Sequence, residues 1–297
     1  MAAEVRNIPP APAAALPRVA RRHLDGWRLL LIPTLAFLLL FFLYPLGFVG
    51  SRSLPGFSVA FYESIATVPV YLKVIVQTFR TSVVVTLVCL LLGYPYAYAM
   101  AHSRGWRLTL LSICLLLPFW VSLLLRTFAW MVLLQDTGII NSALISAGII
   151  DQPLHLIRNV LGVSIGMTHI LLPYVVLPIY SVMRKIDPKL MEAASISGAR
   201  PLRAFVRVFF PLSLPGVFAG ALLAFTLGLG FYITPALLGG ARNTMIAQLI
   251  AGQITEQLNF GFGSALAIVL LVLTALAFGL FGLFLKAGRH QINLSGL

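Results

Sequence analysis

Charged residues are scarce in this sequence: they make up 10% of its 297 residues, against roughly 25% in soluble domains. Because 60% of the residues are hydrophobic, a water-soluble globular fold is excluded. The two cysteines, Cys89 and Cys114, both lie in apolar runs, where a free thiol acts as a small hydrophobe. A disulfide scaffold is therefore excluded as well, and the composition indicates one polytopic membrane domain.

Several chemical motifs are missing. No glycine precedes any of the lysines, at positions 73, 185, 189 and 286, so a phosphate-binding loop of the form G-x4-G-K-[ST] is excluded. The loops carry no metal-ligand cluster, no paired catalytic carboxylates and no nucleophile with His and Asp, so we expect no enzyme, cofactor or metal site. No Asp or Glu lies within a predicted span, which argues against an ion-coupled carrier.

Six apolar windows are long enough to cross a bilayer, which takes about 20 residues. They are Leu29–Ser51, Thr81–Ser103, Leu108–Gln135, Asn159–Met183, Val208–Ala241 and Gln257–Leu285, and Arg126 is the one Asp, Glu, Lys or Arg within them. The fifth and sixth windows exceed one crossing, so each should hold a tilted helix and an uncharged flank. We therefore predict an all-α polytopic protein with six transmembrane helices.

The basic residues set the predicted orientation. With the N-terminus inside, 15 of the 21 Lys and Arg lie on the cytoplasmic side, so both termini are predicted to be cytoplasmic. This distribution explains the net charge of +13 without nucleic acid as a partner. The Ala- and Pro-rich residues 1–27 are expected to form a flexible tail rather than a cleaved signal peptide. Residues 28–290 should form the membrane domain, and residues 291–297 a cytoplasmic C-terminal tail.

The loop between the fourth and fifth predicted spans, within residues 184–211, has the pattern of a capped helix. Asp187 suits the N-cap, Pro188 the first helical position, and Gly198 a left-handed C-terminal turn. Glu192 lies near the positive end of this helix, which should be about ten residues and roughly 15 Å long. From residue 201 a second, basic helix is predicted to run to the start of the fifth span.

Two interpretations of the first loop helix are open. It could lie at the lipid surface, but such a helix usually has bulky apolar residues on one face. Here small residues, Ala193, Ala194 and Ser197, accompany the single carboxylate of Glu192. Small side chains permit close approach of a partner, and the carboxylate can pair with an Arg or Lys, so we favour a protein-docking helix.

This loop resembles a family signature. Glu192-Ala193-Ala194, Gly198 and the segment 208–211 resemble the E-A-A-x3-G-x9-I-x-L-P loop of permease subunits in bacterial ABC importers, with Val208 in place of Ile and Phe210 in place of Leu. The resemblance implies that the loop forms two short helices that dock into a cytoplasmic ATPase. The residues assigned to this coupling site are Asp187, Glu192, Ala193, Ala194, Ser197, Gly198 and Arg200.

A second segment narrows the resemblance. Residues 117–130 resemble the L-P-F-W-x-S-x3-R-T-x-A-W segment of spermidine/putrescine-type permeases, and Asn141 matches the turn T-G-x-x-N that follows it. The resemblance implies a type I ABC importer permease fold, polyamine import by ATP-driven alternating access, and a bacterial inner membrane location. It also implies a second permease, two ATPase subunits that bind ATP and Mg, and a periplasmic solute-binding protein. Another small solute, an ion-coupled secondary carrier or a membrane scaffold are the alternatives.

Candidate residues of the substrate pathway are the charged and aromatic residues of the spans and their outer ends. They are Trp120, Arg126, Trp130, Asp136, Tyr174, Phe231 and Tyr232. Aromatic faces attract ammonium groups, but packing or anchoring at the membrane interface would also explain them. An arginine at the centre of a span costs about 2.5–3.5 kcal/mol, so Arg126 needs compensation. It could pair with Asp136, with an acid of the second permease or with carbonyl groups, or it could extend to the outer boundary.

Two further features of the spans have alternative explanations. His169 could be a proton relay or a hydrogen-bonded packing residue. In the fifth span, Gly220, Gly228, Gly230 and Pro235 could allow close helix packing or a local break. Either property would make the fifth span a candidate for a gating helix.

Overall fold

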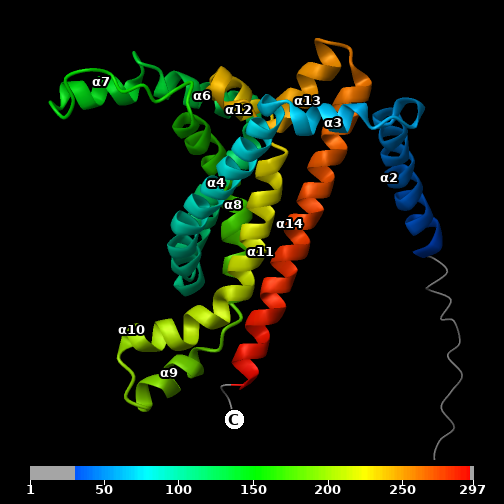
Figure 1. The fold of residues 1–297 in the computed structure, drawn as a ribbon. Coiled ribbons are helices and arrows are strands. Elements are labelled where there is room, and N and C mark those ends of the chain that lie inside the picture. The colour runs from blue at the N-terminus through cyan, green and yellow to red at the C-terminus, as the bar shows by residue number, and fades with distance from the viewer. Residues whose placement is uncertain (1–30, 295–297) are drawn as a thin grey trace, which may run out of the picture. The chain divides into compact units, whose positions relative to one another are not determined.

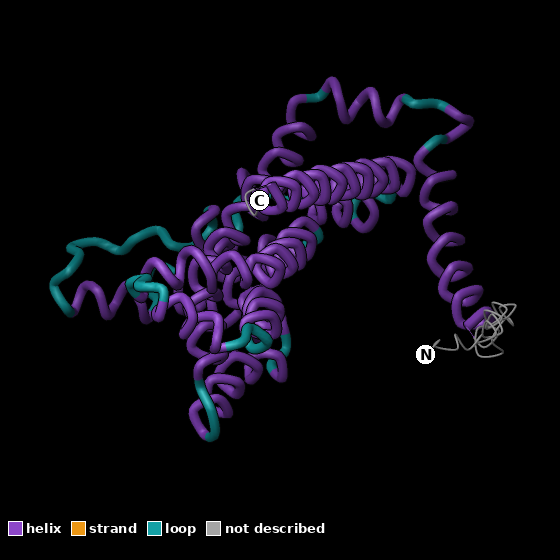
Figure 2. Tube along the Cα trace, turned by 90° about the horizontal axis from the view of Figure 1, so that it is seen from below, coloured by secondary structure: helices purple, strands orange, loops and turns teal. Residues whose placement is uncertain are grey.

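The computed structural model describes residues 31–294, and every regular element in this range is a helix (Figure 2). The chain divides into two units, one ending at Phe48 and the other beginning at Val49. The tail predicted at residues 1–27 lies outside the described residues, as does the end of the tail predicted at residues 291–297.

The helices follow one another with short connections, except for the longer loop 147–159 between α7 and α8 (Figure 1). In chain order they are α2 (Leu31–Ser53), η1 (Pro55–Phe57), α3 (Ala60–Thr67), α4 (Pro69–His102), α5 (Trp106–Leu116), η2 (Leu117–Trp120), α6 (Leu123–Leu134), α7 (Ile139–Ser146) and α8 (Val160–Met183). They continue as α9 (Pro188–Ile196), α10 (Pro201–Ala204), the π-helix η3 (Phe205–Phe209), α11 (Phe210–Leu229), α12 (Ile233–Leu238), η4 (Ala241–Asn243), α13 (Ile246–Thr255) and α14 (Phe260–Leu294). The predicted all-α class is thereby confirmed.

Six stretches are long and apolar enough to cross a membrane, which confirms the predicted number of spans. They are Leu31–Ser53, Pro69–His102, Leu123–Ser146, Val160–Met183, Pro201–Leu229 and Phe260–Leu280. The second begins well before the predicted Thr81, because α4 continues through Lys73 and Arg80. A charge limits the part of a helix that can lie in hydrocarbon, but it does not end the helix itself.

The predicted third span, Leu108–Gln135, is wrong. It is divided into α5, η2 and α6, and the backbone at Val121 and Ser122 is extended, with ψ near 134° and 139°. Pro118 explains why α5 ends at Leu116, because proline has no N–H for the helical hydrogen bond and its ring clashes with the preceding turn. The third apolar stretch instead comprises α6 and α7, which residues 135–138 separate.

The fifth window contains a helix and a flank, as predicted, but the helical stretch starts at Pro201 rather than at Val208. Helix α11 ends at Leu229, with Gly230 as its C-cap, and the predicted flank forms the separate helix α12. At its other end, α11 continues directly from α10 through the π-helix η3, where the Phe210 N–H donates to Phe205 O. Pro211 lacks an N–H, and the wider turn of η3 lies directly before it, where the helical hydrogen-bond pattern must adjust to the missing donor.

The main core lies where α4, α8 and α11 pack against one another. Two glycines of α11, Gly216 and Gly220, permit close approach to α8. A Cβ on Gly220 would lie 2.9 Å from Val175 O, and one on Gly216 would lie 2.9 Å from Ile179 Cα. This is the small-xxx-small arrangement that brings membrane helices into backbone contact.

Helices α9 and α10 lie at one end of the α4–α8–α11 bundle, and α12 and α13 lie at the other (Figure 1). At the α13 end, Thr78 of α4 is fully buried, and its Oγ1 accepts a hydrogen bond of 2.9 Å from Ile246 N at the start of α13. The bundle therefore carries two chemically distinct ends, and the predicted coupling residues are all at one of them.

Candidate functional site

The coupling loop, residues 184–211, begins with the helix that the sequence predicts. The Asp187 carboxylate accepts a hydrogen bond of 2.9 Å from Lys189 N, and Pro188 is the first helical residue. At the C-terminus, Gly198 has φ of +80°, a left-handed conformation that favours glycine. Gly198 N donates to Ser195 O and Ala199 N donates to Ala194 O, which together form a Schellman motif. The predicted caps of α9 are thus confirmed.

Most of the surface of α9 is exposed among the described residues. Glu192 and Ala193 are exposed, and no described residue forms an ion pair or hydrogen bond with the Glu192 carboxylate. Ile196 is 88% exposed and lies one turn after Glu192, on the same side of the helix. Sequence reasoning missed Ile196; its signal was a large apolar residue in a polar loop. The exposed face of α9 thus combines a carboxylate, an isoleucine and small residues.

The opposite side of α9 is attached to the membrane helices. Met191, together with Ile186 before the helix, packs against the main core, and Phe205 of η3 packs there too. The Phe205 ring lies 5.7 Å from that of Tyr98 in α4, measured between centroids. Because aromatic and methionine contacts are close-packed, a displacement of α9 would push on both α4 and the start of α11.

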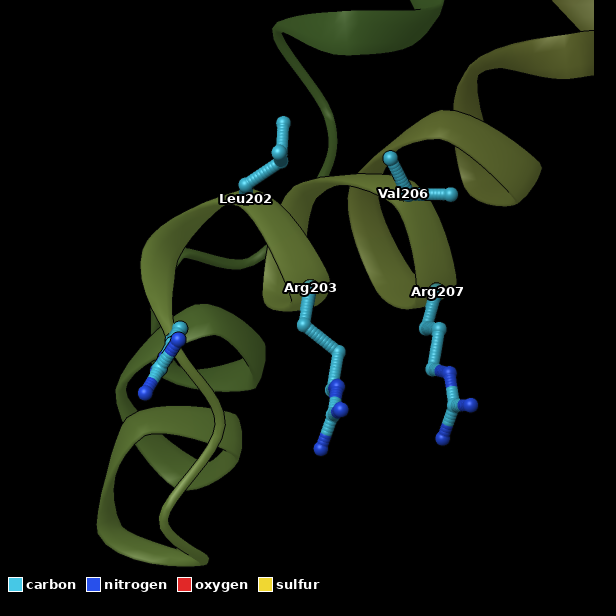
Figure 3. Close-up of a pocket in the computed structure, with 5 residues that line it drawn as sticks. Leu202, Arg203, Val206 and Arg207 are labelled. Atoms are coloured by element: carbon cyan, nitrogen blue, oxygen red, sulfur yellow. The ribbon is translucent and has the colours of Figure 1, made fainter.

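The second part of the coupling loop is amphipathic. In Figure 3, Arg203 and Arg207 point to one side of the helix, and Leu202 and Val206 point to the other. These residues and Arg200 line a shallow depression of about 250 Å³. The predicted basic helix is therefore present as α10 and η3, which continue into α11 without a break.

The predicted pathway residues do not form a single cluster. Trp130 donates a hydrogen bond of 3.0 Å to His169 Nδ1, so α6 and α8 are joined by a polar contact. Tyr174 packs against Phe119, with 5.3 Å between ring centroids. Trp120 is 91% exposed. The three aromatic positions thus have three different environments.

The remaining predicted pathway residues are Asp136, Phe231 and Tyr232. Asp136 lies 3.2 Å from His155 Nδ1, so the two can form an ion pair when the imidazole is protonated. Phe231 packs partly buried against the main core, whereas Tyr232 is half-exposed. The proposed pairing of Arg126 with Asp136 is wrong, because no ion pair joins Arg126 to any residue of the described range 31–294.

The glycines of the fifth predicted span have different roles. Gly220 packs against α8, and a Cβ on Gly228 would lie 3.2 Å from Ser82 Oγ of α4, so both serve close packing. Gly230 ends α11, and Pro235 lies within the separate helix α12. Close packing and a local break are therefore both found, at different positions.

The structure thus defines a polytopic helical membrane protein that presents an exposed, capped helix at one end of its bundle, and comparison with known proteins identifies its class. Residues 27–289 match the family model described as "Binding-protein-dependent transport system inner membrane component". The chain belongs to this family: it is the permease component of an ABC importer and a multi-pass protein of the inner membrane.

Individual relatives are more specific. The spermidine/putrescine transport system permease protein PotB of Haemophilus influenzae is 38% identical over 208 residues, which are 70% of this chain and 73% of that protein. PotB of Escherichia coli (strain K12) is 32% identical over 256 residues, 83% and 93% of the two chains. The same fold occurs in a chain of the crystal structure of a bacterial alginate ABC transporter in complex with an alginate pentasaccharide-bound periplasmic protein. The TM-score is 0.65 at 17% identity, and the match covers 85% of this chain and 93% of that chain.

Proposed function

We propose that this permease forms half of a translocation pathway for a polyamine, and that α9 couples it to a separate cytoplasmic ATPase. The observation that carries the proposal is the exposed, unpaired Glu192 on a helix that is capped at both ends and packed onto the transmembrane core. In this proposal both termini and α9 lie in the cytoplasm. A second permease, two ATPase subunits that bind ATP and Mg, and a periplasmic solute-binding protein complete the importer.

The coupling residues divide into two groups by their role. Asp187 and Gly198 shape the helix, through the N-cap and the left-handed turn. Glu192 provides a directed contact for an Arg or Lys of the ATPase, because its exposed carboxylate can accept charge-assisted hydrogen bonds from either. Ala193, Ala194 and Ser197 allow close approach of the partner, and Arg200 begins the basic second helix.

Transmission from the ATPase to the membrane follows from the packing of the loop. When ATP brings the ATPase subunits together, α9 moves with them, and Met191 and Phe205 pass that displacement to α4 and α11. Because these contacts are close-packed, rigid-body movement is sufficient to alternate access between the two sides of the membrane. No ATP-binding motif is required in this chain.

Charge reversal at Glu192 tests the coupling assignment. In the complex reconstituted with its ATPase and binding protein, Glu192→Lys should abolish uptake and weaken ATPase retention by at least about tenfold, through loss of an ion pair and added repulsion. Glu63→Lys is the matched control: it makes the same change of charge on α3, also at an exposed position, at the opposite end of the bundle. Normal uptake in Glu192→Lys would refute the assignment.

The cargo and the energy source need separate tests. PotB relatives support a polyamine, so uptake of labelled spermidine and putrescine should exceed that of other small organic solutes supplied with their own binding proteins. Orthovanadate should stop uptake, and a proton uncoupler should not. The opposite result would favour an ion-coupled carrier, and vanadate-sensitive uptake of a different solute would keep the coupling mechanism but replace the cargo.

A further inference from the structure

Arg126 of α6 has an unusual environment for an arginine in an apolar helix. Its Nε is buried without a hydrogen-bond partner, and no residue in the described part of the chain accepts a bond from its guanidinium. The nearby acid Asp136 is next to His155 instead. Since Arg126 is only partly buried and Nε is its one wholly buried nitrogen, the two Nη groups can be reached from outside the chain.

A second donor lies beside Arg126. The Trp130 indole N–H can only donate, so its 3.0 Å bond to His169 requires that Nδ1 be the acceptor. The imidazole therefore carries its proton on Nε2, and no described residue accepts that proton either. Arg126 and Trp130 are one turn apart on the same side of α6, so the Trp130–His169 bond holds the His169 ring on the side of α6 that carries Arg126.

Arg126 and His169, which we call the donor pair, have a defined chemical preference. Each offers an N–H group that no described residue accepts, because His169 Nδ1 already accepts from Trp130, and the guanidinium adds a permanent positive charge. The complementary ligand is an anionic group with two oxygens, because a carboxylate can accept parallel bonds from the guanidinium fork. Neutralisation by such a group would also reduce the cost of placing the arginine in an apolar helix.

We propose that the donor pair binds a carboxylate side chain of the second permease subunit. This inference rests on the proposed function, which supplies that subunit and a cationic cargo. A polyamine brings ammonium donors and no acceptor, so it cannot satisfy the donor pair, and an unneutralised guanidinium would repel it. A carboxylate from the second permease satisfies both requirements and joins the two halves of the pathway.

Retention of the second permease tests the inference in the complete complex. Arg126→Gln should weaken that retention by about 30-fold or more, since it leaves a partner carboxylate without its counter-charge. Arg126→Lys should restore much of the loss, because it keeps the charge. Arg242→Gln is the control, since Arg242 is an exposed arginine in η4. Unchanged retention and uptake in Arg126→Gln would overturn the inference.

Cross-linking identifies the source of the carboxylate. In the Arg126→Lys complex, dicyclohexylcarbodiimide should join the introduced amine to a carboxylate in contact with it, and mass spectrometry should place the link on the second permease. The link should be absent in Arg126→Gln. Three outcomes would refute this inference alone. They are retention of the second permease without a link, a link to a carboxylate cargo, and a phospholipid that is retained only when Arg126 is present. A wild-type chain that retains no second permease would refute the proposed function as well.

Discussion

Close packing between α11 and α8 makes a quantitative prediction at Gly220. An alanine there would place Cβ 2.9 Å from Val175 O and 3.1 Å from Val175 Cα, both backbone atoms. Ordinary contact begins near 3.4 Å, so the helices would have to separate by several tenths of an ångström. Overpacking of this kind costs about 1–3 kcal/mol, whereas alanine gains up to about 1 kcal/mol over glycine in helix propensity.

A matched glycine separates these two contributions. Gly279 lies within α14, and a Cβ there would meet nothing within 4 Å, so Gly279→Ala receives the propensity gain alone. The difference in stability between Gly220→Ala and Gly279→Ala should therefore equal the contact penalty, about 1–3 kcal/mol. At about 2–4 °C for each kcal/mol, a penalty of 2 kcal/mol lowers the unfolding midpoint by about 4–8 °C.

Thermal unfolding of the detergent-solubilised protein, followed by tryptophan fluorescence and by loss of the monodisperse peak in size-exclusion chromatography, measures this difference. Both variants must first insert in the membrane at normal levels. Equal midpoints for Gly220→Ala and Gly279→Ala would refute the reasoning, because the backbone contact between α11 and α8 would then be absent or freely adjustable.

Two other predictions concern buried hydrogen bonds. Thr78→Val keeps the shape of the side chain but leaves Ile246 N without its acceptor, so it should destabilise the protein by about 1–3 kcal/mol in the same unfolding assay. Thr255→Val is the control and should have little effect, because Thr255 is exposed and its hydroxyl bonds only to Ala251 O. Asn141→Ala removes the two hydrogen bonds of 2.9 Å that join the Asn141 side chain to the backbone N–H and C=O of Leu154. It should make residues 148–156 several-fold more sensitive to limited proteolysis, and unchanged digestion would show that these bonds do not order the loop.

The sequence predicted the features that depend on neighbouring residues. Apolar length determines which segments can cross a bilayer, so the number of spans was correct, although several boundaries were not. The caps of α9 were also predictable, because Asp187, Pro188 and Gly198 act within one turn of the backbone. Pro118 was a local signal for the end of α5, but it lies inside an apolar window that is long enough to cross the membrane.

The candidate pathway was less predictable. The contact of Trp130 with His169 joins residues 39 positions apart, and the contact of Thr78 with Ile246 joins residues 168 apart. Each depends on the rotation of two helices about their axes, which composition does not specify. The same holds for Asp136, whose position in the chain suggested Arg126 as its partner, whereas the fold brings it to His155.

The sequence by itself determined that this protein crosses the membrane through six apolar stretches and presents a capped helix with a small-residue, acidic surface. Tertiary structure decided which polar groups meet, that Arg126 has no acceptor within the described residues, and that Met191 and Phe205 link α9 to the core. The physical reason is range: hydropathy and caps act over adjacent residues, whereas side-chain partners are chosen by the packing of helices distant in the chain.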